Sequence, residues 1–563
     1  MKENGDFNKF AAMKQGKIGK SAIKHLDDIT ANPMKIQKEF LMKLLKDNKD
    51  TEYGKKYGFE NIHSIEEYRS SLPLTNYNDY SEYIKRMTEE GEKNLITSYD
   101  IIIYNRSSGT VGLPKKVPMT QVGAEKFLLY NGEYEAGLIT KKFGNSLSLG
   151  RTINLIQCNE KMPIMKDGNI FGAISERVIT KAKPVWTKLF TSPIEASFSG
   201  PGVNKRYLHA RYALSDDKAT KILCSFASIC LDFLRYIEKN WKILVKDIEK
   251  GTIDQSIELP DEVREKLIKN LKPDVKRAKE LQKIFEQGFD TPFVPKVWPN
   301  LKLVSCAATG TFKQYAAKLQ KKYTGNISFY RRGVAASEGV FSVATEFDSC
   351  SSSLIPDAIF YEFLPEDEDT ISENLVTLDK LEVGKRYELF ITNLSGFYRY
   401  NMKDVFEVKG FYNNTPTIEF CYRSDKTINI MGEKTSEVAL HTAVHATAKE
   451  CGFYLVDSTV YPDIDNSRYI FLIEAECFPK NFDLEKARNV LEKELAKANP
   501  SMADKIKRGL CSPTVLKLLP PGAFKSYMEF MHMKGNCSSQ IKPVSVISNE
   551  VQRKFFFDLI EKE

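Results

Sequence analysis

The chain has 563 residues, 42% of them hydrophobic and 11% aromatic, which excludes an intrinsically disordered protein and leaves room for more than one buried core. Its 82 basic and 74 acidic side chains leave a formal charge of +8. Because the two signs are interspersed along the chain, this small surplus does not indicate a nucleic-acid surface, and we expect no nucleic-acid partner.

The six histidines and ten cysteines form no recognisable metal motif. No Cys-x-x-Cys pair occurs, and His441 and His445 lie in an alanine-rich segment that favours a structural role. The first residues lack the apolar core of a signal peptide, and no stretch reaches the ~20 apolar residues that span a bilayer. We therefore expect a cytoplasmic monomer with reduced thiols and no membrane partner.

Hydrophobic periodicity predicts helices and short strands in alternation, which favours an α/β fold. One helix signal is Asn32-Pro33, an N-cap followed by proline at the first helical position. Helices are expected at 65–90 with a break at Pro73, at 217–250 and at 260–290. Short apolar runs predict strands at 101–104, 301–308, 327–330, 358–364 and 386–392.

Beyond Arg423 the alternation of predicted helices and strands starts again, and it predicts a smaller α+β unit. Two apolar runs, 454–460 and 469–474, have the form of paired strands, and Asp483 caps a helix that ends at Asn499-Pro500. The division that we expect is an N-terminal domain over 1–422, a hinge over 423–436 and a small C-terminal lid domain over 437–563.

The strand at 101–104 leads into a polar turn, Ser107-Ser108-Gly109-Thr110, that continues to Lys115. Backbone N–H groups in such a turn converge on an anion, the hydroxyl groups add donors, and the lysine adds a mobile positive charge. The spacing differs from that of a Walker A loop. The segment therefore predicts a phosphate site, against the simpler interpretation of an ordinary surface turn.

Three further segments carry weaker signals, each of which has a structural interpretation when taken alone. In 333–339 (GVAASEG), small residues let a planar ring approach the backbone, and Glu338 offers an oxygen ligand to Mg²⁺. In 396–404 (GFYRYNMKD), the Asp404 carboxylate can accept hydrogen bonds from ribose hydroxyls. The charged segment 422–437 lies between the two pattern blocks and suits a hinge.

In this order the four segments resemble the adenylate-forming enzyme superfamily, and the surrounding sequence resembles the Gretchen Hagen family of auxin-responsive acyl acid amido synthetases. Landmarks of that resemblance are Leu72-Pro73-Leu74-Thr75, Thr191-Ser192-Pro193, Trp298-Pro299-Asn300-Leu301 and Ser539-Gln540-Ile541-Lys542. The resemblance implies a large N-terminal adenylate-forming domain, with β-sheets flanked by helices and a β-barrel-like part. It also implies a small, mobile α+β C-terminal domain that rotates between half-reactions.

The resemblance implies an activity as well. Members of this family activate a carboxylic acid with ATP, form an acyl adenylate and pyrophosphate, and pass the acyl group to the amine of an amino acid with release of AMP. The expected cofactors are ATP and Mg²⁺, and the expected partners are a small carboxylic acid and an amino acid.

Site residues follow by match to the family motifs. The catalytic lysines would be Lys115, Lys434 and Lys542, and the metal ligand would be Glu338. The nucleotide and acyl contacts would be Ser107, Ser108, Gly109, Thr110, Thr309, Gly310, Ala335, Ala336, Ser337, Tyr398, Asp404 and Arg423.

Two positions depart from the plant members of the family. Val334 stands where they have tyrosine, so the stacking face for adenine is expected from another residue, with Tyr330 as the candidate. Lys403 stands where they have glycine, which leaves the local turn open. Substrate choice is therefore not carried over from plant hormones.

Two other functions stay open on the sequence alone. An acyl-CoA synthetase shares the adenylation step and uses a thiol, although the landmarks near Trp298 and Gln540 favour the amide-forming family. A module that binds nucleotide or acyl acid without turnover is suggested by the two departures, whereas the presence of Lys115, Glu338 and Asp404 favours an enzyme.

Overall fold

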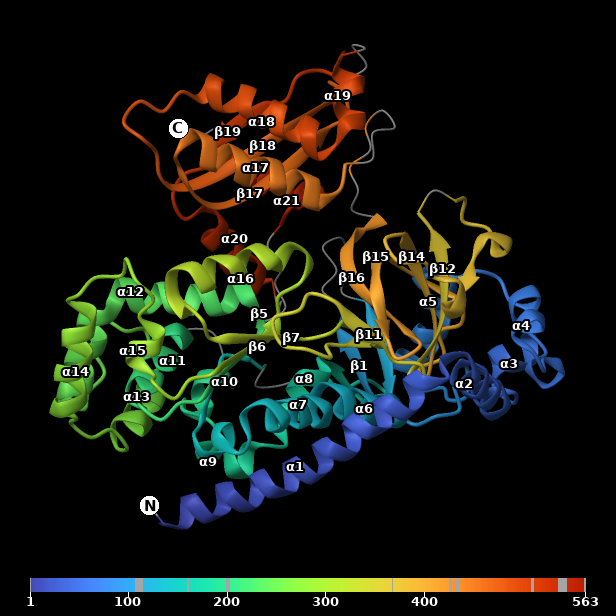
Figure 1. The fold of residues 1–563 in the computed structure, drawn as a ribbon, viewed down its shortest axis with the longest axis horizontal. Helices are drawn as coiled ribbons and strands as arrows, with labels where there is room; N and C mark the ends of the chain where they lie inside the picture. The colour runs from blue at the N-terminus through green and yellow to red at the C-terminus, as the bar shows by residue number, and fades with distance from the viewer. Residues whose placement is uncertain are drawn as a thin grey trace. The chain divides into compact units, whose positions relative to one another are not determined.

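The computed structural model describes residues 2–106, 115–158, 162–198, 203–366, 368–424, 428, 430, 435–507, 511–534 and 544–560. These residues form two compact units: the first holds 2–106, 115–402 and 407–420, and the second holds 403–406 and the part that starts at Cys421 (Figure 1). The α/β class expected from the sequence is confirmed. No helix in the described ranges is both long and apolar enough to cross a bilayer.

The first unit opens with helices whose limits follow local signals. The predicted Asn32-Pro33 start is confirmed, because α1 (Lys2–Ala31) is followed by α2 (Pro33–Asn48). The predicted break at Pro73 is also confirmed. Three short helices surround it, α3 (Glu52–Lys56), α4 (Ile65–Ser71) and α5 (Tyr77–Lys85), and the last begins with a capping box at Asn76.

A four-stranded parallel sheet with the order β3-β5-β6-β7 forms the centre of the α/β part. Its strands are β3 (Thr152–Asn154), β5 (Lys221–Phe226), β6 (Leu303–Ala307) and β7 (Ser328–Arg331). In Figure 1, α12 (Ala227–Lys250) and α16 (Lys313–Leu319) lie on one side of these strands and α7 (Tyr134–Phe143) lies on the other.

The helix predicted over 217–250 is wrong over residues 221–226, which form β5. The strand has six residues and α12 begins directly after it, so the pattern is too short for periodicity to separate it from that helix. The helix expected over 260–290 is divided into α13 (Asp261–Ile268) and α14 (Val275–Phe285), and Pro273 lies between them. The strands predicted at 301–308 and 327–330 are confirmed as β6 and β7.

A seven-stranded sheet, ordered β10-β11-β16-β15-β14-β12-β13, is the largest sheet in the described part of the chain. It contains the predicted strands at 358–364 and 386–392 and occupies the place of the expected barrel-like part, with β10 and β13 at its edges. Its members are β10 (Ser342–Val343), β11 (Ser352–Leu354), β12 (Ile359–Pro365), β13 (Val376–Thr377), β14 (Arg386–Asn393), β15 (Tyr400–Tyr412) and β16 (Thr415–Arg423).

The predicted strand at 101–104 is confirmed as part of β1, which lies in a small sheet of the order β2-β1-β4. The strands are β1 (Ile101–Arg106), β2 (Lys116–Thr120) and β4 (Ile170–Gly172). The remaining helices of the first unit are α6 (Gln121–Leu128), α8 (Ile174–Thr180), α9 (Trp186–Leu189), α10 (Ile194–Ser197), α11 (Lys205–Leu214) and α15 (Val294–Val297).

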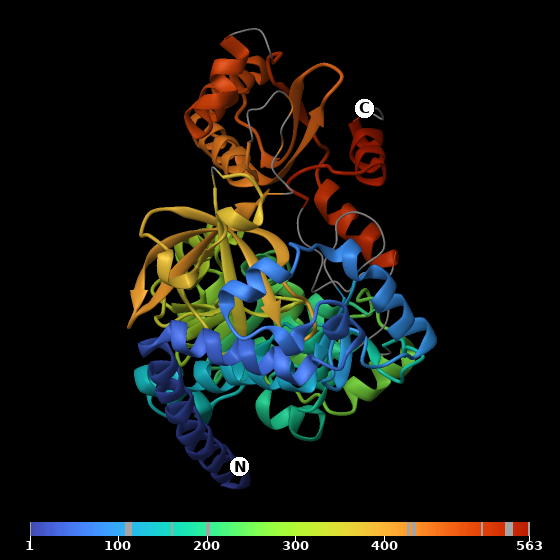
Figure 2. The same ribbon diagram turned by 90° about the vertical axis from the view of Figure 1, so that its right-hand side faces the viewer.

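The second unit is a three-stranded sheet between two pairs of helices (Figure 2). The predicted strand pair and the Asp483 cap are confirmed. Along β18, Phe471 and Ile473 join the core under α17 and α18, whereas Ile470 and Leu472 join the core under α20 and α21. The elements are β17 (Tyr454–Asp463), β18 (Arg468–Cys477), β19 (Val515–Leu518), α17 (Glu437–Cys451), α18 (Leu484–Ala498), α19 (Pro500–Lys507), α20 (Ala523–Met533) and α21 (Glu550–Ile560).

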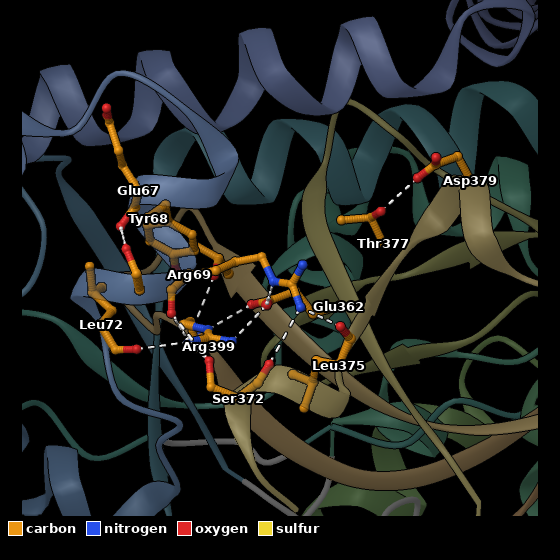
Figure 3. Close-up of polar contacts among 12 residues, drawn as sticks. Glu67, Tyr68, Arg69, Leu72, Glu362, Ser372, Leu375, Thr377, Asp379 and Arg399 are labelled. Carbon is orange, nitrogen blue, oxygen red and sulfur yellow. Dashed lines mark hydrogen bonds and ion pairs between the residues drawn. The ribbon is translucent and has the colours of Figure 1, made fainter. Parts of the chain in front are cut away.

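A buried ion pair fixes the start of β15 in the first unit (Figure 3). The Arg399 side chain is 0% exposed, and its Nε and Nη2 donate to the two carboxylate oxygens of Glu362 on β12 at 3.0 and 2.8 Å. Its Nη1 donates to the carbonyls of Arg69 and Leu72 and to the Ser372 hydroxyl. One guanidinium therefore joins β12 to the segment after α4 and holds its own backbone at φ 48°.

We expect Arg399→Met to lower the free energy of unfolding of the first unit by about 3 kcal/mol, because it removes two hydrogen bonds to the buried Glu362 carboxylate and leaves Arg69, whose Nε lies 3.2 Å from Glu362 Oε1, as its counter-charge. Urea unfolding measures the change. The double variant Arg399→Met/Glu362→Gln removes that charge and should regain part of the loss. A single variant as stable as the parent would contradict this account of the ion pair.

Candidate nucleotide site

The predicted phosphate turn connects two paired strand ends of the first unit. Arg106 at the end of β1 pairs with Lys116 at the start of β2. Ser107, Ser108, Gly109 and Thr110 lie outside the described residues, so their assignment stays a prediction. The described residues on either side of the turn show which other parts of the first unit lie near it.

Tyr77 of α5 connects two of the predicted site residues. Its hydroxyl accepts a hydrogen bond from the Lys116 N–H at 3.0 Å, and the Lys115 ammonium lies 4.9 Å from the centre of its ring. Burial raises the pKa of the Tyr77 hydroxyl, and the nearby Glu338 carboxylate raises it further. Lys115 therefore lies beside the Tyr77 ring, and the Glu338 carboxylate acts electrostatically on the hydroxyl of the same residue.

Ser337 and Glu338 form the tip of a two-stranded hairpin, β8 (Ala335–Ala336) and β9 (Gly339–Val340). The tip is held through its backbone. The Asn105 amide donates to the Ser337 carbonyl at 2.8 Å, and the Asn393 amide donates to the Glu338 carbonyl at 2.8 Å. The backbone is therefore fixed while the Ser337 and Glu338 side chains stay half-buried.

Asn105 ties this hairpin to the strand that precedes the phosphate turn. The residue is buried at the end of β1, and its Oδ1 accepts a hydrogen bond from the Ile174 N–H at 3.0 Å. Sequence reasoning assigned no role to Asn105 or Asn393. No local pattern shows either role, because Asn105 and Asn393 act on partners that are distant in the sequence.

Thr309 and Gly310 follow the carboxyl end of β6, and Gly333 follows the neighbouring strand β7. Ligands of parallel α/β sheets bind at this edge. Gly310 has φ 57°, and a side chain there would meet the half-buried Phe420 ring at 2.6 Å. At Gly333 the Ser342 carbonyl lies 2.1 Å from the position of a Cβ, so the close packing of the backbone requires glycine there. The expectation that a planar ring approaches the segment 333–339 stays a prediction.

Two tyrosines expected near the nucleotide are core residues instead. Tyr398 is 0% exposed, stacks on Tyr53 at 5.0 Å and donates its hydroxyl to the Ile96 carbonyl. Tyr330 is also buried, with its hydroxyl on the Ala344 carbonyl. Neither ring presents a face to a ligand, so Tyr398 is corrected to a structural residue and Tyr330 does not replace the tyrosine missing at Val334.

The second unit contains a pair of predicted ribose ligands. Arg423 Nη1 lies 3.1 Å from Asp404 Oδ1, and the Asp404 side chain is 10% exposed. Lys403, which stands at a family glycine position, has φ 61°. The left-handed backbone explains why glycine suits this position. Lys434 and Lys542 lie outside the described residues, so their roles stay predictions.

The Glu338 carboxylate is a ligand of the kind that Mg²⁺ accepts. Mg²⁺ is commonly held by one or two carboxylates together with substrate phosphates and water. Within the described ranges, no three His, Cys, Asp or Glu side chains gather as a complete metal cage. Glu338 is a half-buried carboxylate on a hairpin tip whose backbone is held by Asn105, a residue of the strand that leads into the predicted phosphate turn. It therefore fits a Mg²⁺ site that the protein shares with substrate phosphates.

The overall fold matches that of the solved structure of the GH3.15 acyl acid amido synthetase with a TM-score of 0.81 and 24% identity, over 95% of this chain and 96% of that one. The GH3 family N-terminal domain matches residues 22–329, the central domain matches 352–423 and the C-terminal domain matches 438–551. The chain belongs to the GH3 family.

Curated relatives agree with this membership. The chain is 26% identical to a putative indole-3-acetic acid-amido synthetase, GH3.9 of Arabidopsis thaliana, over 95% of each chain. It is 27% identical to a jasmonoyl-L-amino acid synthetase, GH3.5 of Oryza sativa subsp. japonica, over 92% of this chain and 93% of that one.

We expect Asn105→Ala to weaken binding of Mg·ATP about tenfold, because it releases the Ser337–Glu338 tip from β1. Asn48→Ala is a matched control. Asn48 is equally buried and makes the same kinds of bond, from its amide to the Leu44 carbonyl and from the Ser98 N–H to its Oδ1. Both variants should lose about 1–3 kcal/mol of stability. Equal affinities in calorimetry would remove Asn105 from the site.

Proposed function

We propose that this chain is an ATP-dependent acyl acid amido synthetase that joins a small carboxylic acid to the amine of an amino acid. The observation that carries the proposal is membership of the GH3 family along the length of the chain. Lys115, Glu338 and the Asp404–Arg423 pair, which match the family motifs, support it. Magnesium and ATP as cofactors belong to the same proposal.

The proposed reaction has two steps. In the first, a carboxylate oxygen attacks the α-phosphorus of ATP, an oxygen–phosphorus bond forms, and the bond to pyrophosphate breaks. In the second, the amine attacks the acyl carbon, the carbon–oxygen bond to AMP breaks, and the amine loses a proton as the amide forms. Neither step needs a covalent nucleophile of the protein, so catalysis depends on alignment and on positive charge.

Different residues of this chain would align the substrates and supply the positive charge. Lys115 places a cation beside negative charge that develops on the phosphates, and the Tyr77 ring limits where its ammonium can go. Glu338 would hold Mg²⁺, which neutralises phosphate charge when bound. Asp404, held by Arg423, would accept ribose hydroxyls. Thr309, Gly310, Ala335 and Ala336 are proposed to line the adenine and acyl pocket.

The domain division stays part of the proposal, with 1–422 for adenylation and acid binding, 423–436 as hinge and 437–563 as lid. Lys434 and Lys542 would then act from the hinge and the lid, where positive charge stabilises the transferring groups. The relatives are named for indole-3-acetic acid and jasmonate. For this chain the acid is proposed as a class only, because the sequence departs from the plant members at Val334 and Lys403.

A pyrophosphate-exchange assay with Mg·ATP and pooled carboxylic acids tests the function. We expect exchange with some acid, an amide and AMP when an amino acid is added, and no exchange after EDTA. Lys115→Met should slow exchange about 10²–10³-fold, the usual cost of a lost charge-stabilising donor. Lys302→Met, an exposed lysine outside the site, is the control.

Two results would contradict the proposal. Thioester formation with coenzyme A in place of an amide would assign the chain to the acyl-CoA synthetases. No exchange with any acid, from protein that binds ATP, would assign it to the binding modules.

A further inference from the structure

A cluster of charged side chains lies on the α7 side of the parallel sheet and has no role in the proposed chemistry. Each member comes from a different element. Lys221 is the first residue of β5, Ser305 is the middle residue of β6, Arg332 directly follows β7, and Glu135 lies on α7.

Glu135 is the centre of the cluster. Its Oε1 accepts a hydrogen bond from the Ser305 hydroxyl at 2.8 Å, and its Oε2 accepts one from Arg332 Nη2 at 3.0 Å. Arg332 Nε also donates to the Ser305 hydroxyl at 3.2 Å. Lys221 Nζ lies 3.9 Å from Glu135 Oε1 and forms no hydrogen bond with any residue in the described ranges. The guanidinium is thus held in one orientation, whereas the ammonium is not.

The charges of the cluster do not balance. Burial alone would raise the pKa of Glu135, but Arg332 and Lys221 hold it below its ordinary value, so the group is a carboxylate. Two cations therefore share one anion. Burial, with Arg332 as a second cause, lowers the pKa of Lys221, as expected for an ammonium with incomplete compensation. An additional anion would relieve this imbalance.

The exposed ends of the cluster are the two cations. The side chains of Lys221 and Arg332 are 22% and 25% exposed, whereas that of Glu135 is 5% exposed. The carboxylate and the Ser305 hydroxyl, which is fully buried, therefore form a support behind two basic side chains that are partly exposed. Basic side chains that are partly exposed and are held from behind by buried polar groups are typical of an anion-binding site.

The cluster is continuous in sequence with the proposed substrate pocket. Arg332 immediately precedes Gly333, which opens the segment that contains Ala335, Ala336 and Glu338. Both proposed substrates, the acid and the amino acid, carry a carboxylate. A fixed guanidinium is a strong and directional partner for that group.

We infer that Lys221 and Arg332, supported by Glu135 and Ser305, form a subsite for a substrate carboxylate. The inference rests on the proposed function and adds a binding site to it. The carboxylate belongs either to the acid or to the amino acid, and the two half-reactions separate these sources, since pyrophosphate exchange needs no amino acid.

The test compares Arg332→Gln, Lys221→Gln and the double variant Arg332→Gln/Glu135→Gln with the parent protein. The double variant carries no unpaired buried carboxylate, so it keeps the test valid where the single variant folds poorly. Arg277→Gln is the matched control, because Arg277 has a buried guanidinium that donates to the Leu214 and Val297 carbonyls. Exchange is measured against acid and against ATP, and amide formation against amino acid.

We expect Arg332→Gln and the double variant to raise the KM for one substrate roughly tenfold to a hundredfold, the usual effect of one hydrogen bond to a charged group, with Lys221→Gln in the same direction. The KM for ATP should not change, and Arg277→Gln should change stability alone. A raised KM in exchange assigns the subsite to the acid, and one confined to amide formation assigns it to the amino acid.

The inference is overturned if both Arg332 variants keep the KM values for acid and amino acid within about twofold of the parent. A parent protein that exchanges pyrophosphate with no acid overturns the proposed function itself, and the subsite with it. The two failures are therefore distinguishable.

Discussion

A buried guanidinium must have its donors satisfied, and Arg399 meets this condition by joining three parts of the first unit. It pairs with Glu362 on β12, donates to carbonyls at the end of α4, and donates to the Ser372 hydroxyl. These contacts hold a left-handed residue at the start of β15, where Thr75 and Asn401 also pair through their backbones. The same strand, β15, continues in sequence to Asp404, a predicted ribose ligand.

Buried polar groups also find hydrogen-bond partners at the tip of the β8–β9 hairpin. Asn105 and Asn393 hold the backbone of Ser337 and Glu338, and Tyr77 holds the lysine that follows the phosphate turn. In each case a polar group whose partner is distant in the sequence holds the backbone beside a predicted ligand-binding side chain. Glu135 with Ser305 repeats the arrangement behind Arg332. Rigid support behind a reactive group is what catalysis by alignment and charge requires.

The features that the sequence predicts correctly are those that depend on residues close together in the chain. The Pro73 break, the strand before the phosphate turn and the Asp483 cap depend on neighbouring residues, and all three are confirmed. The prediction of helix over 221–226 is wrong because this strand is short and leads directly into a helix, so periodicity cannot separate the two. Tyr398 matched a motif, but whether a tyrosine faces a ligand or a core depends on tertiary packing. Arg399, Asn105 and Glu135 act through partners far away in the sequence, so no motif could reveal them.

The account claims that a carboxylate oxygen becomes bonded to the α-phosphorus and stays with AMP when the amide forms. The most direct test uses a carboxylic acid labelled with ¹⁸O in its carboxylate, with ATP, Mg²⁺ and an amino acid, and mass analysis of the nucleotide product. The account predicts AMP with one ¹⁸O atom for each amide formed. Label in inorganic phosphate with ADP as the nucleotide product, or amide formation with unlabelled AMP, would contradict it.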